Sequence, residues 1–205
     1  YDRGKHELDY TEDYAIATKD LSLLKHIPEL IDMGVSSFKV EGRMRSIYYI
    51  ATVISIYRKV IDEYCDNPLN YEYNRSYETE LYRCANRDSI PQYFDSKPGV
   101  NEQYYLGREE VSNQDFLGIV IDYDETKKEA IIEQRNFFKI GDEVEIFGPS
   151  LEKNCFKVKS ISDEKGELLD AARHPRQIVR IPLEKKVSKN DLMRVKLVVD
   201  NNWDL

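Results

Sequence analysis

Apolar residues repeat at two different periods along this chain, and the change of period limits the folds that the chain can adopt. Between Ser46 and Tyr64 they recur every three or four residues, as in an amphipathic helix. This stripe consists of Ile47, Ile50, Ala51, Ile54, Tyr57 and Ile61. Beyond Phe116, short runs of alternating character are separated by turn residues, which is typical of strands. We therefore expect an α+β protein whose C-terminal part is a small antiparallel β-barrel or sandwich.

The first third of the chain has the order helix, strand, helix. Pro28 and Gly34 suit the start and the end of a short helix at Glu29–Met33, and Val35–Glu41 is a candidate strand before the long helix. Short links between such elements are typical of a parallel sheet covered by helices. This order predicts the tail of a larger α/β domain.

Composition divides the chain into three predicted parts. These are residues 1–66 as the end of an α/β barrel domain, 67–115 as a connector with one helix around Tyr77–Asn86, and 116–205 as the β module. Within the β module the candidate strands are Phe116–Asp122, Ala130–Arg135, Glu143–Phe147, Phe156–Ile161, Gln177–Ile181 and Met193–Val199.

The candidate strand Val35–Glu41 carries the most informative polar pattern. Alternate residues of a strand share a face, so Lys39 and Glu41 point away from their apolar neighbours, and Arg43 continues the charged side. Parallel α/β folds place their reacting groups at the carboxyl ends of strands. We interpret these three residues as candidate catalytic groups. The alternative is an ion-pair cluster that closes a barrel mouth.

Charge is unevenly distributed. The chain has 30 Lys and Arg against 38 Asp and Glu, a net charge of −8, yet residues 173–196 contain eight basic and two acidic residues. Arg173, Arg176 and Arg180 are therefore candidate phosphate contacts for RNA. The stretch lacks the interleaved aromatic residues that stack on bases. Its alternative interpretation is the solvated face of two strands.

Several function classes are excluded or disfavoured by the sequence. No apolar run is long enough to span a membrane as a helix, and no secretion signal opens the chain, so we expect a cytoplasmic protein. Its three cysteines are far apart, which fits a reducing compartment better than a disulfide framework. The sequence shows neither a paired histidine metal motif nor a Gly-x-Ser-x-Gly elbow. It therefore predicts no metal site and no hydrolytic triad within this chain.

Short motifs in both halves of the chain resemble one known family. In the first half they are Lys19-Asp20-Leu21, Ile27-Pro28-Glu29-Leu30-Ile31, Phe38-Lys39-Val40-Glu41-Gly42-Arg43-Met44 and Tyr48-Tyr49-Ile50-Ala51-Thr52-Val53. In the second half they are Arg135-Asn136-Phe137-Phe138, Gly141-Asp142-Glu143-Val144-Glu145-Ile146, Ala172-Arg173-His174-Pro175-Arg176-Gln177-Ile178 and Asp191-Leu192-Met193-Arg194. Together they are similar to the collagenase-like peptidases, family 32 of unassigned catalytic type.

The resemblance implies a longer parent protein with an N-terminal α/β (TIM-like) barrel and a C-terminal β-barrel module, of which this chain is the C-terminal half. One branch of the family acts on tRNA wobble uridine and uses prephenate to form 5-hydroxyuridine, and other members are described as collagen-degrading proteases. The resemblance also implies Lys19 and Asp20 as substrate-binding residues. The implied partners are tRNA or a peptide, together with the missing N-terminal barrel.

One position departs from the family pattern. Several members hold an iron–sulfur cluster, and the family commonly has Lys-Asp-Leu-Cys where this chain has Ser22 after Leu21. Thiolates hold such clusters, so serine is a poor replacement. We expect no cofactor within this chain, whereas an iron–sulfur cluster in the parent depends on ligands elsewhere.

Three hypotheses follow for function. In the first, the chain is the C-terminal half of an RNA-hydroxylation protein. In the second, it is the C-terminal half of a peptide-bond hydrolase. In the third, it is a non-catalytic binding region. The basic stretch favours the first over the second, and Ser22 favours the third over the first. In each case we expect the isolated chain to bind no iron and to cleave no peptide.

Overall fold

The chain forms two compact units in the computed structural model. The structure describes residues 17–43, 45–85, 88–97, 102–104, 115–149 and 153–196. One unit comprises residues 1–23 and 87–111, and the other comprises residues 24–86 and 112–205. None of the described helices is both long and apolar enough to cross a membrane.

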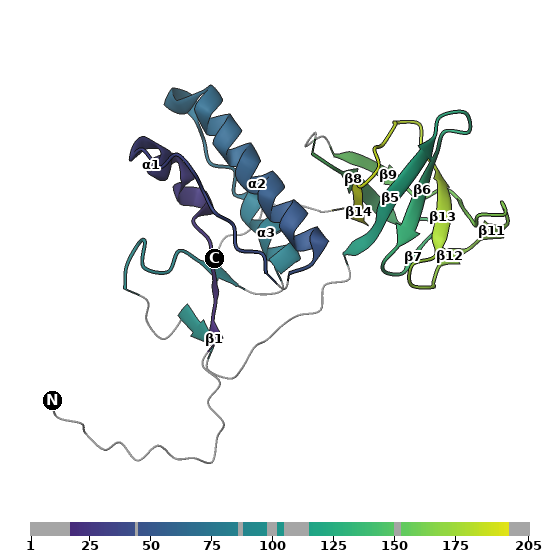
Figure 1. The fold of residues 1–205 in the computed structure, drawn as a ribbon, viewed down its shortest axis with the longest axis horizontal. Helices are drawn as coiled ribbons and strands as arrows, with labels where there is room; N and C mark the ends of the chain where they lie inside the picture. Colours follow the sequence, from purple (N-terminus) through teal and green to yellow (C-terminus); the bar gives the residue numbers. More distant parts are fainter. Residues whose placement is uncertain are drawn as a thin grey trace, which may run out of the picture. The chain divides into compact units, whose positions relative to one another are not determined.

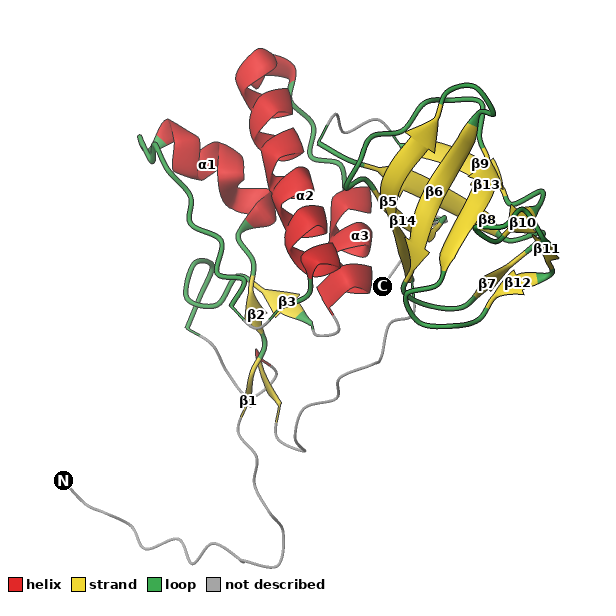
Figure 2. Cartoon of the chain, turned by 45° about the vertical axis from the view of Figure 1, so that its right-hand side comes forward, coloured by secondary structure: helices red, strands yellow, loops and turns green. Residues whose placement is uncertain are grey.

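The smaller unit is built on two short strand pairs, which Figures 1 and 2 show. Strand β1 (Ala17–Thr18) is antiparallel to β4 (Gln103–Tyr104), and β2 (Asp20–Leu21) is parallel to β3 (Ser89–Ile90). The parallel pair is extended by the N–H of Ser22, which donates to the carbonyl of Ile90 at 2.9 Å. Two segments that are about 70 residues apart in the sequence are thereby joined.

Three α-helices lie side by side in the described part of the larger unit (Figure 2). They are α1 (Ile27–Asp32), α2 (Ile47–Asp66) and α3 (Ser76–Ala85), and α2 contacts both of the others. Short 3-10 turns precede α1 (η1, Leu24–His26) and follow α2 (η2, Pro68–Asn70). The predicted start of the long helix is confirmed, because Ser46 caps it by accepting the Tyr49 N–H on its side-chain oxygen at 3.1 Å.

The buried face of α2 is not the predicted isoleucine stripe. The helix buries Tyr48, Thr52, Val53, Ile56, Val60 and Tyr64. In contrast, Ile47, Ile50 and Ile54 are 63%, 38% and 47% exposed. The sequence pattern is ambiguous because α2 is apolar on two faces, and periodicity cannot say which face meets a neighbour.

The predicted strand Val35–Glu41 does not form within the described residues, and this prediction was wrong. A strand needs a neighbouring backbone to receive its hydrogen bonds, and no described strand pairs with this segment. The predicted alternation of side chains is nevertheless present. Phe38 and Val40 pack against the helical core, while Lys39 and Glu41 are exposed.

The β module is a curled antiparallel sheet that forms half a barrel (Figure 2). Its eight strands have the order β11-β10-β13-β6-β5-β14-β8-β9. In sequence these are β5 (Phe116–Asp124), β6 (Glu129–Gln134), β8 (Glu143–Phe147), β9 (Asn154–Lys157), β10 (Ile161–Ser162), β11 (Leu168–Leu169), β13 (Ile178–Pro182) and β14 (Leu192–Val195). A separate pair joins β7 (Phe138–Lys139) to β12 (Ala171–Ala172).

Six sequence-predicted strand segments correspond to strands of this sheet, with two changes. The predicted strand Phe156–Ile161 is divided between β9 and β10, because Val158 leaves the ladder and bonds with Asp142 and Gly141. The last predicted strand, Met193–Val199, corresponds to β14, which begins at Leu192 and ends at Val195, and residues 197–199 lie outside the described residues.

Alternation along the strands builds the core of the β module. On β6 the buried residues Ala130, Ile132 and Gln134 alternate with half-buried residues on the outer face. Gly118 lets β5 approach β6 closely, because a Cβ at this position would lie 2.5 Å from Ile132 Cγ2. The sheet therefore encloses a tightly packed interior.

A buried arginine links the helices to the sheet. Arg194 on β14 is 0% exposed, and its Nε and Nη2 atoms each lie 2.5 Å from a carboxylate oxygen, of Glu145 on β8 and of Glu80 on α3 respectively. Lys153 donates to the second oxygen of Glu80 at 2.6 Å. The guanidinium also lies over the ring of Phe147, 4.3 Å from its centroid.

The electrostatics of this cluster favour its charged form. Burial alone would raise the pKa of Glu80, but the Arg194 guanidinium and the Lys153 ammonium outweigh that cost and lower the pKa below its ordinary value. The carboxylate therefore remains ionised and holds α3 against the sheet.

We expect Glu80→Ala to destabilise the fold by on the order of 3 kcal/mol, because it removes one of the two carboxylates that compensate the buried Arg194 charge. The matched control is Glu125→Ala, which removes an exposed ion pair with Lys186 and should cost far less, because solvent screens such a pair. Urea unfolding of both variants measures the difference. Equal losses would show that the buried cluster adds nothing beyond a surface pair.

Candidate functional site

The sequence-predicted site residues lie in three places. Lys19 and Asp20 belong to the smaller unit, where the Lys19 ammonium is 3.2 Å from the carboxylate of Asp88. The Asp20 N–H donates to the Asp88 carbonyl at 3.0 Å. Asp88 thus anchors both residues at the edge of the β2–β3 pair.

Lys39, Glu41 and Arg43 lie in the segment that leads into α2, and all three side chains are exposed. The structure connects two of them, since Glu41 Oε1 accepts the backbone N–H of Arg43 at 2.9 Å. This bond fixes the turn before the helix and leaves the Arg43 guanidinium in solvent. Such an arrangement presents a cation and a carboxylate to a ligand.

Arg173 and Arg176 lie in the loop between β12 and β13, which packs beside the loop between β6 and β7. Two hydrogen bonds of 2.9 Å join the β12–β13 loop to the end of β6, where the other loop begins: the Arg176 N–H donates to the Gln134 carbonyl, and the Gln134 N–H donates to the Gln177 carbonyl. Gln177 Oε1 also accepts the N–H groups of Arg173 and of the next residue, each at 3.3 Å. The two loops therefore form one surface.

We call this surface the arginine–phenylalanine surface. It consists of Arg135, Phe137, Arg173, His174 and Arg176, all of which are exposed. The Arg173 guanidinium lies 5.6 Å from the centroid of the Phe137 ring, which is 50% exposed. An exposed aromatic ring beside arginines is the arrangement that RNA-binding proteins use to stack on bases.

Two carboxylates partly balance the three arginines. Arg135 Nη2 is 2.6 Å from Glu133 Oε1, and Arg176 Nε is 3.8 Å from the same atom. Arg173 pairs with Asp170. The Arg176 side chain is 75% exposed and its backbone has a φ of 65°, a left-handed conformation that non-glycine residues adopt at a cost. One extended arginine is thus presented to solvent from a constrained backbone.

Sequence reasoning missed Phe137 as part of this surface. The residues around Arg173 contain no aromatic side chain, and Phe137 is brought there from a loop 36 residues earlier. The signal that could have found it is the pair Phe137-Phe138 directly after a predicted strand. Consecutive residues in extended backbone point to opposite sides, so one of the two was bound to be exposed while Phe138 is fully buried.

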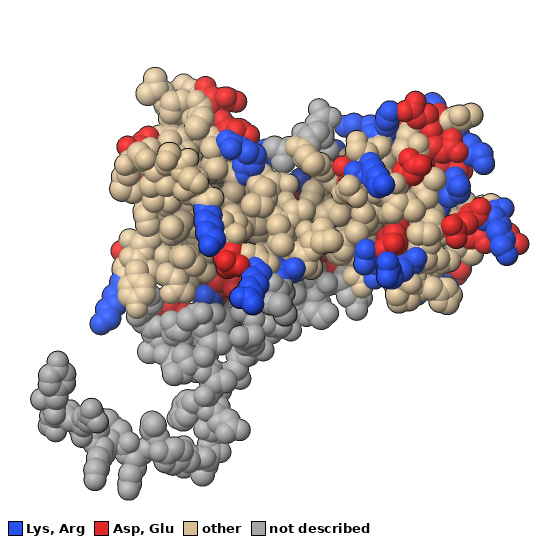
Figure 3. Space-filling view, viewed as in Figure 1, with Lys and Arg blue, Asp and Glu red and all other residues tan. Residues whose placement is uncertain are grey.

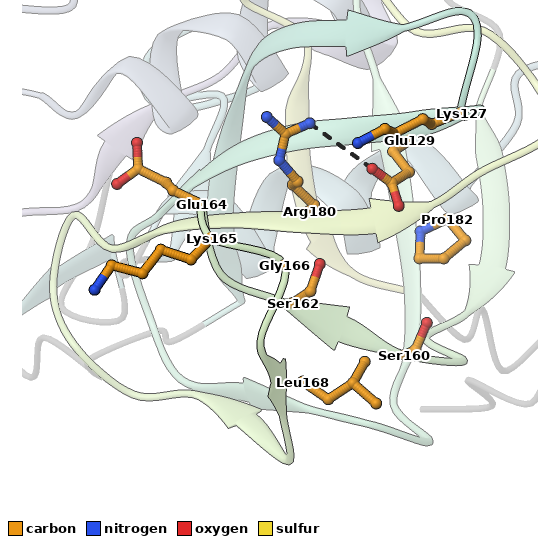
Figure 4. Close-up of a pocket in the computed structure, with 10 residues that line it drawn as sticks. All are labelled: Lys127, Glu129, Ser160, Ser162, Glu164, Lys165, Gly166, Leu168, Arg180 and Pro182. Carbon is orange, nitrogen blue, oxygen red and sulfur yellow. Dashed lines mark ion pairs between the residues drawn. The ribbon is translucent and has the colours of Figure 1, made fainter.

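Arg180 lies on the outer face of β13, beside a polar pocket of about 280 Å³ (Figure 4). Its Nη1 atom is 3.7 Å from Glu129 and 4.0 Å from Asp124. The pocket is lined by residues of the β5–β6 and β10–β11 hairpins and of β13. The predicted basic stretch is therefore divided between the arginine–phenylalanine surface, this pocket and the buried Arg194.

The described residues do not fit an iron–sulfur cluster. Cys65 and Cys155 are exposed and Cys84 is buried, where desolvation raises the pKa of its thiol to about 12. Burial also raises the pKa of Cys155, with the neighbouring Glu145 carboxylate adding to the effect. The described part of the chain contains no group of three or more His, Cys, Asp or Glu that could hold a metal ion. A cluster needs several thiolates together, and neither these thiols nor Ser22 supply them.

Comparison with known proteins places the chain in a family. Residues 2–104 match the family described as Peptidase family U32, and residues 112–194 match the Peptidase family U32 C-terminal domain. The chain therefore belongs to peptidase family U32.

Relatives of the chain carry two kinds of name. It is 48% identical to tRNA hydroxylation protein P1 of Bacillus subtilis over 88% of this chain and 43% of the relative. It is 28% identical to tRNA hydroxylation protein P of Haemophilus influenzae over 92% of the chain and 40% of the relative. A Porphyromonas gingivalis protein named collagenase is 28% identical over 90% of the chain and 51% of the relative. The chain thus spans about two fifths to one half of the length of these relatives.

One solved structure is similar to part of the chain. The crystal structure of the C-terminal domain of a U32-family protein from Geobacillus thermoleovorans is 40% identical. The match covers 42% of this chain and 98% of the solved domain, with a TM-score of 0.40.

We expect the three thiols to react with Ellman's reagent at three different rates. Cys84 should stay protected until the protein unfolds, because it is 5% exposed and its pKa of about 12 leaves it protonated. Cys155 should react more slowly than Cys65, because its raised pKa reduces the thiolate fraction. The variant Cys65→Ser assigns the fast phase, and one common rate for all three thiols would contradict the described burial.

Proposed function

We propose that the full-length protein takes part in the hydroxylation of tRNA wobble uridine to 5-hydroxyuridine, with prephenate as a co-substrate, and that the β module binds the tRNA. The arginine–phenylalanine surface is the observation that carries this proposal. Support also comes from the relative with 48% identity, which is named as a tRNA hydroxylation protein.

The chemistry of the surface suits RNA better than a peptide. Arginine presents a planar fork of N–H donors that matches phosphate oxygens, and Arg176 extends such a fork into solvent. The exposed ring of Phe137 offers a face on which a base can stack, and the Arg173 guanidinium lies next to that ring. Phosphate contacts and one stacked base are the elements of single-stranded RNA binding.

The overall charge of −8 opposes RNA binding, so the affinity must come from local groups. Figure 3 shows basic and acidic side chains intermixed over the visible face of the β-strand part, without a large region of one sign. We therefore expect weak, salt-sensitive binding by the isolated chain. Contacts made by the rest of the full-length protein add to it.

We propose that Glu41 and Arg43 act at the reaction site of the full-length protein, with Lys39 beside them. Arg43 can bind a carboxylate of prephenate with two parallel hydrogen bonds. The bond from its N–H to Glu41 Oε1 holds the turn that presents it. Lys19 and Asp20 remain candidate substrate-binding residues in the smaller unit.

Peptide hydrolysis is the second candidate function. It is favoured by the relatives named collagenase, at 28% identity. The cysteines of the chain do not support it, because the buried Cys84 stays protonated and the pKa of Cys155 is raised. A non-catalytic binding region is the third, and Ser22 is the residue that favours it.

The double variant Arg173→Ala, Arg176→Ala should weaken tRNA binding and flatten its dependence on salt by roughly one unit of slope for each lost phosphate contact. The matched control is Arg58→Ala, Arg75→Ala, which removes two exposed arginines from the helical region. Fluorescence anisotropy with labelled tRNA at several salt concentrations measures both quantities. Identical slopes for the two double variants would assign Arg173 and Arg176 to the solvated face of the loop.

In the full-length protein, Glu41→Gln should reduce 5-hydroxyuridine formation by at least ten-fold and leave the melting temperature unchanged. The side chain is exposed and makes a local hydrogen bond that glutamine can also accept, so the fold loses little. Mass spectrometry of tRNA from complemented cells reports the activity, and calorimetry reports the melting temperature. A lower melting temperature with full activity would make Glu41 a structural residue.

A further inference from the structure

The pocket beside Arg180 has the shape and chemistry of a small binding site. Its base is the outer face of neighbouring strands, where Ser162 on β10 is directly opposite Arg180 on β13. Its walls are the β5–β6 and β10–β11 hairpins, which contribute Lys127 and Lys165 (Figure 4). The cavity of about 280 Å³ is therefore formed by three segments that are far apart in the sequence.

The Arg180 guanidinium lies near two carboxylates but is not within hydrogen-bond distance of either. Its distances of 3.7 Å to Glu129 and 4.0 Å to Asp124 both exceed a hydrogen bond. Asp124 Oδ1 is instead occupied by its own turn, where it accepts the N–H groups of Thr126 and Lys127 at 3.0 Å each. The half-buried guanidinium thus retains N–H donors that a ligand in the pocket can reach.

The charge balance of the pocket favours a neutral ligand. Three cations, Lys127, Lys165 and Arg180, are matched by Glu129 and Glu164 in the lining and by Asp124 beside it. A bare anion would gain little from such a balanced site. The remaining lining offers Ser160 and Ser162 hydroxyls, which both donate and accept, and the apolar surfaces of Leu168 and Pro182.

These groups match an uncharged molecule that has hydrogen-bonding edges and an apolar surface, and a nucleobase has both. Arg173 and Arg176 of the arginine–phenylalanine surface lie in the loop before β13, and Arg180 lies on β13 four residues after Arg176. An RNA strand bound at that surface can therefore extend to the pocket. A base that is unpaired can enter it and expose its edges to hydrogen bonds.

We infer that the pocket beside Arg180 binds one unpaired nucleobase of the RNA that the arginine–phenylalanine surface holds. In this role Arg180 contacts the base and not a phosphate, and Ser162 contributes a hydrogen bond to the base edge. This inference rests on the proposed RNA-binding function for its biological ligand, but the pocket itself can be tested with a free nucleoside.

The first measurement is a titration of the chain, residues 1–205, with uridine, followed by amide chemical shifts. We expect shifts at residues 160–168 and at Arg180, and their loss in Arg180→Gln but not in Arg58→Gln, a matched change at an exposed arginine of α2. The absence of shifts at these amides in millimolar uridine would overturn the inference, whatever the chain does with RNA.

The second measurement compares anisotropy titrations of oligouridylate and of an abasic oligonucleotide of the same length. The preference for the base-bearing strand should fall about ten-fold in Arg180→Gln, with the salt slope unchanged. An unchanged preference with a salt slope flattened by about 0.7 would make Arg180 a phosphate contact and overturn the inference. Uridine binding without any RNA binding would support the pocket and contradict the proposed function instead.

Discussion

The ionic contact between Arg194, Glu80 and Glu145 determines how the larger unit is assembled. A fully buried guanidinium charge is costly unless it is paired, and here both Glu80 on α3 and Glu145 on β8 pair with it. Such a cluster adds little stability over well-packed apolar residues, but separating a carboxylate from Arg194 leaves a buried charge uncompensated. The rings of Tyr48 on α2 and Phe116 on β5 are stacked, with their centroids 5.2 Å apart, and form a second contact between the helices and the sheet. The helices and the half-barrel are consequently one body within this unit.

The elements that the sequence predicted well are those determined by local signals. Ser46 marks the start of α2, and short runs rich in apolar residues with flanking turns mark β6 and β8. The segment Val35–Glu41 has the alternation of a strand, but a strand also depends on a second backbone, which the segment itself does not encode. Arg194 shows the same limit. It belongs to the basic stretch 173–196, for which we predicted phosphate contacts or a solvated strand face, but the structure buries it completely.

The candidate site was only partly predictable for a related reason. Arg173 and Arg176 were identified from charge density alone, which is a property of one segment. Phe137 belongs to the same surface only because the loops meet across the sheet.

Membership of family U32 is shown by matches to both halves of the chain. The relatives carry two kinds of name, so hydroxylation and hydrolysis are the competing proposals for the longer protein.

The register between β6 and β13 limits where residues can be inserted near the arginine–phenylalanine surface. In the observed register Ile178 is opposite Glu133 and Arg180 is opposite Ile131, so the charged residues of both strands share the outer face. A slip of one residue in either strand would turn its charged side chains into the apolar interior and its buried residues, such as Ile132 or Val179, toward water. An insertion within either strand should therefore destabilise the sheet more than an insertion in the loops at its ends. The surface can diversify between family members by loop replacement while the ladder beneath it stays unchanged.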